Sequence, residues 1–127
     1  MPYMITDDGF AIIANRIKGV GTQPLYIGWG TDSTAPAKTD ATLAAEAAGY
    51  TRATGVSSIA TVTETGDAYV VTGTLTAAAA ITIKEWGLFD AVSGGNLLVR
   101  ETYPAGYVLG IGGFLNFTLA VVIRRTA

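Results

Sequence analysis

The segment 80–103, AITIKEWGLFDAVSGGNLLVRETY, constrains the fold more than any other part of the chain. Ile81 and Ile83 alternate with polar neighbours, and alternation resumes from Leu97, so both arms have the two-residue period of half-buried strands. The glycine pair within residues 90–96 can take positive φ without steric cost, which is typical of a hairpin loop. The segment therefore predicts a β-hairpin. Because a lone hairpin is marginal in water, further strands must cover it.

Three residues of this hairpin predict how it packs. Trp86 and Phe89 offer the large apolar area that would anchor it to other elements. Gly87 interrupts the first arm, which indicates either a bulge or a close approach of another part of the chain.

A helix is predicted over residues 5–18. Thr6 is a suitable N-cap, and the aspartates that follow it lie where the helix dipole favours negative charge. Gly19 is a suitable residue to end the helix. The apolar side chains that recur at helical spacing are Phe10, Ile13, Ala14 and Ile17. This stripe is expected to lie on the sheet or on a neighbouring subunit.

The rest of the chain predicts strands joined by turns. An alanine-rich segment, 41–48, is the exception, because Asp40 could cap a short helix there. The expected strands are 24–30, 59–64, 68–76 and 114–124, with 50–58 as either an edge strand or an extended loop, and the expected connections are 31–39, 65–67 and 104–112. The predicted fold is mainly β, an antiparallel β-sandwich or flattened barrel with one N-terminal α-helix, in a single domain over residues 1–127.

Composition narrows the classes of partner. The net charge is −2 and the cations are scattered, so the chain has no stripe of the kind that binds nucleic acid. The longest apolar run, 119–123, is far shorter than the roughly 20 residues that span a membrane. Cysteine and histidine are absent, which excludes disulfides, thiolate metal sites and the commonest general base. Only 14% of residues are charged, so part of the surface is expected to be covered by copies of the chain or by a partner.

A series of short motifs runs along most of the chain. They are Ile5-Thr6-Asp7-Asp8-Gly9 with Ile13, Gly28-Trp29-Gly30-Thr31, Thr34-Ala35-Pro36-Ala37 with Asp40, Leu43 and Glu46, Val71-Thr72-Gly73-Thr74-Leu75-Thr76, and Ile83-Lys84-Glu85-Trp86-Gly87-Leu88-Phe89-Asp90. Their types and order resemble those of small tailed-phage virion structural proteins. Members of that group are head decoration (cement) proteins or tail-fibre and baseplate components. The resemblance implies a structural role in the virion for a chain made in the host cytoplasm.

Within that group, the compact and weakly charged chain favours a capsid decoration protein that binds between capsid subunits and stabilises the head. A tail-fibre or baseplate attachment protein is the alternative, and a glycan-binding module is a third interpretation. The expected location is the capsid surface in preference to the tail. The expected partners are the major capsid protein and copies of the chain itself, in a homo-oligomer such as a trimer, without nucleic acid or membrane.

The residues expected to bind these partners lie in an arm and two loops, which are expected to be mobile until a partner orders them. They are Met1, Pro2, Tyr3, Met4, Thr31, Asp32, Pro36, Lys38 and Tyr107.

Two carboxylates could give the chain acid–base chemistry. Glu85 and Glu101 lie on the two arms of the predicted hairpin and could face each other. Nothing in the sequence indicates a positioned donor with a tuned pKa, so the favoured interpretation is that Glu85 bonds to backbone or to Arg100. The protein is therefore expected to act without catalysis and without a cofactor.

Loop aspartates could bind calcium. Asp32, Asp40 and Asp90 have no EF-hand spacing, so the capping of turns and helices is their favoured role.

Four aromatic residues, Trp29, Trp86, Tyr103 and Tyr107, could form a platform on which a sugar stacks. Packing in the core or at a subunit interface is the favoured interpretation, because aromatic residues dominate both.

Overall fold

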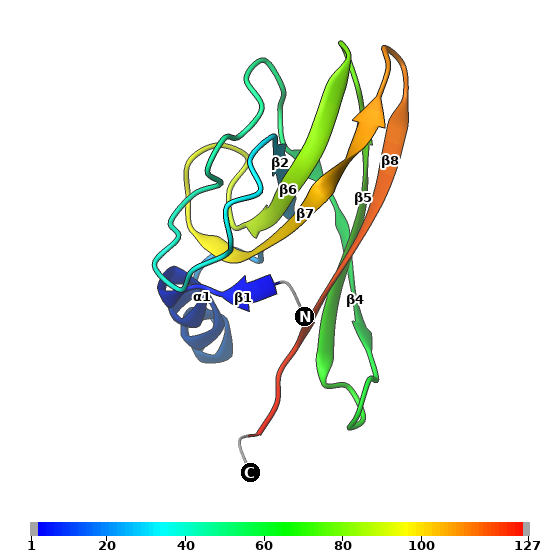
Figure 1. Ribbon diagram of the computed structural model, residues 1–127. Helices are drawn as coiled ribbons and strands as arrows, with labels where there is room; N and C mark the ends of the chain where they lie inside the picture. Colours follow the sequence, from blue (N-terminus) through cyan, green and yellow to red (C-terminus); the bar gives the residue numbers. More distant parts are fainter. Residues whose placement is uncertain (1–2, 126–127) are drawn as a thin grey trace.

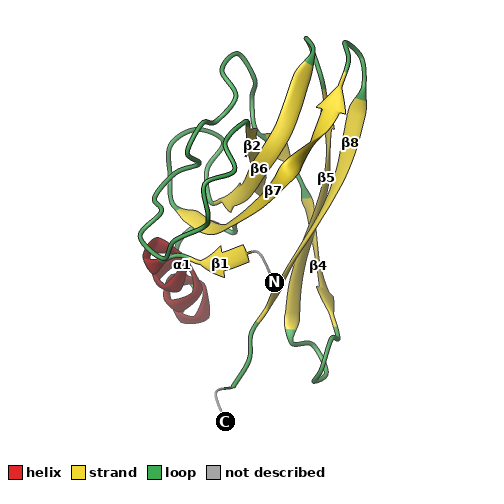
Figure 2. Ribbon diagram, in the orientation of Figure 1, coloured by secondary structure: helices red, strands yellow, loops and turns green. Residues whose placement is uncertain are grey.

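The computed structural model describes residues 3–125, which fold into two antiparallel β-sheets and one helix (Figures 1 and 2). The first sheet has the strand order β1-β7-β6-β2-β3, and the second has the order β4-β5-β8. The elements are β1 (Tyr3–Ile5), α1 (Asp7–Lys18), β2 (Tyr26–Gly30), β3 (Ala53–Thr54), β4 (Val56–Ala60), β5 (Ala68–Thr76), β6 (Ile81–Phe89), β7 (Leu97–Leu109) and β8 (Phe114–Val122). The predicted mainly β class, with antiparallel sheets and an N-terminal helix, is confirmed.

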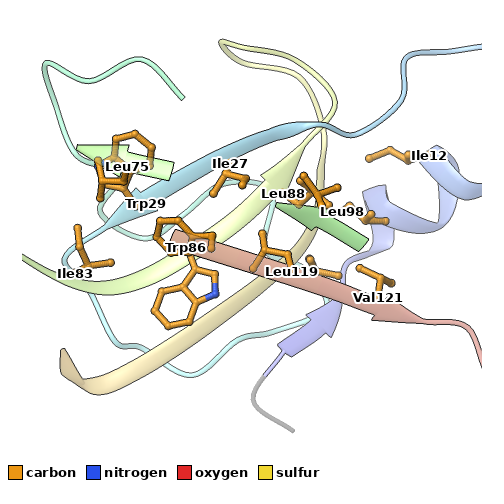
Figure 3. Close-up of a cluster of buried hydrophobic side chains, with 13 residues drawn as sticks. Ile12, Ile27, Trp29, Leu75, Ile83, Trp86, Leu88, Leu98, Leu119 and Val121 are labelled. Carbon is orange, nitrogen blue, oxygen red and sulfur yellow. The ribbon is translucent and has the colours of Figure 1, made fainter. Parts of the chain in front are cut away.

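The core lies between the two sheets, and α1 packs against it from one end (Figure 3). Ile27 and Leu88 enter it from the first sheet, Leu119 and Val121 from the second, and Ile12 from the helix. All five side chains are buried. Removal of this apolar area from water is the main term that holds the two sheets together.

The predicted hairpin is β6 and β7, at the centre of the first sheet. Gly87 pairs with Arg100, and an added Cβ on Gly87 would lie 3.0 Å from the carbonyl oxygen of Val99, so the predicted close approach is confirmed. The irregular pairing lies on either side of Gly87, between Ile83 and Glu85 and between Leu88 and Phe89.

The segment 104–112 is not the irregular connection that its glycines predict. β7 instead continues to Leu109. Residues 103–106 form a bulge opposite Lys84, and regular pairing with β6 resumes between Ile83 and Tyr107. This bulge accommodates the residues that disfavour a regular strand, so the ladder does not end there.

The helix has both predicted caps. The hydroxyl oxygen of Thr6 accepts a hydrogen bond from the Gly9 amide at 2.9 Å, and Gly19 takes the left-handed conformation with φ of 88°. Ile5 belongs to β1 and not to the helix. Helical structure within residues 3–125 is nowhere long and apolar enough to cross a membrane.

The packed face of α1 differs from the predicted stripe. Gly9 and Ile12 are buried, whereas Phe10 is 61% exposed and Ile17 is 84% exposed. The entry of the chain sets this orientation, because Thr6 donates its hydroxyl hydrogen to the carbonyl oxygen of Leu97 on β7. That bond turns the glycine side of the helix toward β7.

One strand of the second sheet begins and ends earlier in the sequence than predicted. β4 covers Val56–Ala60, so the expected strand over 59–64 is wrong and the ambiguous segment 50–58 supplies an edge strand instead. The chain turns after Ala60 because the Asp67 carboxylate accepts hydrogen bonds from the three successive amides of residues 62–64 at 2.8–2.9 Å. β5 and β8 lie where they were predicted, although β8 ends at Val122.

The predicted helix over 41–48 is also wrong. The segment lies along the end of β2, where Gly30 and Glu46 form an isolated β-bridge. The amides of Ala44 and Ala45 donate to the carboxylate of Glu85 at 2.8 and 2.7 Å in place of helical carbonyls. A buried charge therefore overrides the helix propensity of alanine.

Candidate functional site

A buried ion pair joins the central strands of the first sheet on the face opposite the core. Arg100 on β7 donates from Nε to Oε1 of Glu85 on β6 at 2.9 Å, and the two residues are 1% and 0% exposed. Each is the partner that the sequence suggested for the other. Charges buried to this extent must satisfy their remaining hydrogen-bonding groups nearby.

The further hydrogen-bond partners of the pair come from the segment that we call the outer loop, residues 31–52, although Nη2 of Arg100 has no partner among the described residues. The Glu85 carboxylate accepts from the amides of Asp32, Ala44 and Ala45 at 3.2, 2.8 and 2.7 Å. Arg100 donates from Nη1 to the carbonyl oxygen of Thr34 at 2.8 Å and to the carboxylate of Asp40 at 3.3 Å. Because these two buried charges bind residues 32, 34 and 40, we expect this stretch to be ordered in the free protein, whereas the sequence suggested that residues 31–38 are mobile until a partner orders them.

Arg52 anchors the far end of the outer loop. Its guanidinium makes two hydrogen bonds to Glu46 at 2.8 and 3.0 Å, and it lies 3.4 Å from the ring centroid of Phe89. It also donates to the carbonyl oxygens of Ala91 and Gly94 in the hairpin loop. Sequence analysis missed this residue, although a lone arginine in a run of small residues was an available signal.

The residues predicted to bind partners do not form one surface. Met1 and Pro2 lie outside the described residues. Tyr3 and Met4 are in β1, paired with Glu101 and Arg100, so this part of the expected arm is a strand. Thr31, Asp32, Pro36 and Lys38 are together in the outer loop, with Thr31 and Lys38 exposed. Tyr107 is on the opposite face of the first sheet, beside Trp86, and belongs to β7 and not to a loop.

The three loop aspartates have the capping roles that the sequence favoured. Asp32 accepts from the amide of Thr34, Asp40 from that of Ala37, and Asp90 from that of Asn96. Hydrogen bonding from Thr34 lowers the pKa of Asp32 below its ordinary value. Residues 3–125 contain no group of three or more side chains suited to holding a metal ion.

The two candidate catalytic carboxylates lie on opposite faces of the first sheet. Glu85 pairs with Thr102 and points into the outer loop, whereas Glu101 pairs with Trp86 on the core side. The two carboxylates therefore do not face each other, and Glu85 instead bonds to backbone amides and to Arg100, as the favoured interpretation had it. Burial raises the pKa of Glu101 above its ordinary value of 4.5, against the effect of a hydrogen bond from the Trp86 side chain.

The aromatic residues pack mainly on one another. Trp29 is buried against Tyr50, and its register partner on β6 is Trp86. Tyr103 and Tyr107 stack with ring centroids 4.6 Å apart, and Tyr107 lies 6.0 Å from Trp86. The stacked pair uses one face of each tyrosine ring, and the other contacts bury ring edges and tilted rings, which supports the packing interpretation.

Of the grooves on the described part of the chain, two bear on the aromatic residues and on the helical stripe. The first, which we call the aromatic groove, has a volume of about 230 Å³ between β7 and β8, and its lining includes Trp86, Glu101, Tyr107 and Phe117. The second, which we call the helix groove, has about 380 Å³, and exposed Ile17 of α1 and Ile123 lie in its wall. The sequence contained one indication of the helix groove. The apolar stripe of the helix was expected to lie on the sheet or on a neighbouring subunit, and Ile17 of that stripe lies in the groove wall.

Glu101 gives a testable pH dependence. Because its pKa is raised in the folded state, folding binds a proton above pH 4.5, and stability falls as the pH rises from there to the folded pKa. We expect Glu101→Gln to remove this decline and to leave stability at pH 7 equal to or slightly above that of the wild type, by under about 1 kcal/mol for a half-exposed group. Urea unfolding at a series of pH values measures this. Parallel stability profiles for the two proteins would contradict it.

The fold and these sites define a class: a small antiparallel β-sandwich whose surface loop is fastened by buried charges. The family described as Podophage GP4 fiber I protein gp80 matches residues 15–121, and the chain belongs to that family. It is therefore a phage structural protein, as the sequence motifs suggested. No curated protein and no solved structure matches the chain.

Proposed function

We propose that the protein is a component of the phage tail fibre and attaches there to other virion proteins. The family match carries this proposal, because it extends from the last turn of α1 almost to the end of β8 and its description is that of a fibre protein. It favours the tail-fibre alternative over the capsid decoration interpretation, which rested on compactness and low charge alone. We further propose that the chain acts by binding, as a homo-oligomer and without catalysis.

The outer loop is the surface that we propose for attachment. Its anchoring by Glu85, Arg100 and Arg52 supports this, because a loop that is ordered beforehand does not lose conformational entropy when a partner binds. Exposed residues such as Thr31 and Lys38 are presented on that fixed backbone.

Antibody labelling of purified virions tests the location. Gold-conjugated antibody raised against this chain is expected at the tail in negative-stain micrographs. Labelling of the head and not of the tail would overturn the proposal and support capsid decoration. Virions that lack the gene product provide the control for non-specific adsorption.

Single cysteines test the attachment surface, because the chain has none of its own. We expect Lys38→Cys to react with a maleimide in the free protein and to be at least about tenfold slower in virions, where a partner covers the outer loop. Thr63→Cys is the matched control, since Thr63 is also exposed but lies in the turn between β4 and β5. Equal reactivity of Lys38→Cys in both states would contradict attachment through the outer loop.

A further inference from the structure

One edge strand of the molecule lacks the usual protection. Among the described residues, the sheets end in β1, β3 and β4, of three, two and five residues, and in β8, of nine. β8 reads FLNFTLAVV, without a charged residue, proline or glycine, and it pairs with β5 without a register shift. Natural sheets normally blunt a long edge with charges, proline or a bulge, because unpaired backbone groups invite another strand.

The surface beside this edge combines apolar and polar side chains. Figure 1 shows β8 next to the upper part of β7, and the aromatic groove lies between these strands. Phe114, the first residue of β8, is 63% exposed, and Tyr103 and Tyr107 on β7 are 39% and 42% exposed. Apolar side chains that gather at one edge indicate a surface that another chain covers.

The sequence of β8 is complementary to itself. In an antiparallel pair of two copies centred on Thr118, small and apolar side chains oppose one another, and no like charges meet. The opposed residues are Leu115 with Val121, Asn116 with Ala120, Phe117 with Leu119, and Thr118 with its own copy. Self-complementarity of this kind is what a two-fold interface requires, since the same patch must serve on both subunits.

We propose that a second copy of this chain pairs with the first along β8, so that the two three-stranded sheets join into one continuous sheet. Backbone hydrogen bonds between the two edges supply affinity, the opposed side chains set the register, and the exposed apolar residues around the aromatic groove supply buried area. The inference rests on the proposed self-association but not on the proposed tail location. An oligomer that forms without β8 pairing would overturn this inference alone, whereas a monomer would overturn the proposed self-association as well, and antibody labelling tests the tail location separately.

A charge placed at the two-fold position tests the pairing. Thr118 is exposed, so Thr118→Lys leaves the fold intact but sets two lysines opposite each other across the interface. We expect the wild type to sediment at twice the mass of the 13.1 kDa chain, and the dimer dissociation constant of Thr118→Lys to rise about tenfold or more. Thr72→Lys is the matched control, because Thr72 pairs with Thr118 within the subunit and is exposed on the same face, one strand in from the edge.

Mixing opposite charges identifies the register. Thr118→Lys and Thr118→Glu proteins are each expected to be mainly monomeric, and their mixture is expected to form heterodimers, detected by native mass spectrometry. Circular dichroism checks that both variants are folded. The inference is overturned by a wild type that is monomeric or trimeric, by equal weakening in Thr72→Lys, or by a mixture of folded variants that forms no heterodimer.

Discussion

Replacing Arg100 with methionine is expected to lower the free energy of unfolding by about 3–5 kcal/mol, the largest effect of any single substitution considered for this chain. The substitution leaves the Glu85 carboxylate buried without its counter-charge, at a site with no access to water. It also removes the hydrogen bonds that Arg100 donates to Thr34 and Asp40 in the outer loop. Urea unfolding followed by tryptophan fluorescence measures the loss.

Two comparisons separate this effect from a general loss of charge. The double variant Glu85→Gln with Arg100→Met is expected to be more stable than Arg100→Met alone, because no unpaired charge then remains in the interior. Arg125→Met is the exposed control, since Arg125 pairs with Glu64 where both side chains are mostly in solvent. That substitution is expected to cost under about 1 kcal/mol. Equal losses for Arg100→Met and Arg125→Met would show that burial does not matter here.

Gly30→Ala is expected to have the second largest effect, a loss of about 1–3 kcal/mol. An added Cβ would collide with the carbonyl oxygen of Ala45 and would lie 2.6 Å from Oε2 of Glu85. The outer loop must therefore move away from the end of β2, which breaks the bonds that hold it to the buried ion pair. Urea unfolding gives the stability, and the rate of limited proteolysis within residues 31–52 reports on the loop.

Gly110→Ala is the matched control for that substitution. Gly110 does not have a positive φ, and nothing lies within 4 Å of the position that its Cβ would take. We expect its stability to stay within about 0.5 kcal/mol of the wild type, as for a surface change away from special features. If Gly30→Ala behaved in the same way, the close packing of the outer loop on β2 would be contradicted.

The elements that follow from local pattern were predictable. The hairpin of β6 and β7 and the alternation in β8 depend on side chains that face one core, and the two caps of α1 depend on residues adjacent to the helix. Glu85 could be assigned to Arg100 because both lie on neighbouring strands of that hairpin. In these cases neighbouring residues carry the information.

The errors arose where distant residues decide the structure. Residues 41–48 have the composition of a helix, but Glu85, some 40 residues away, binds the amides of Ala44 and Ala45. The exposed side of α1 holds apolar residues because the bond from Thr6 to Leu97, 91 residues away, sets which face meets β7. Arg52 escaped notice because its partners come from both the outer loop and the hairpin loop. Local propensity contributes too little to outweigh such tertiary contacts.

Amide hydrogen exchange in the free protein tests most directly whether the outer loop is ordered before any partner binds. We expect the amides of Ala44 and Ala45 to exchange slowly in the wild type, as part of the same protected unit as β6, and rapidly in Arg100→Met. Exchange of these two amides at unfolded-chain rates in the wild type would contradict this expectation.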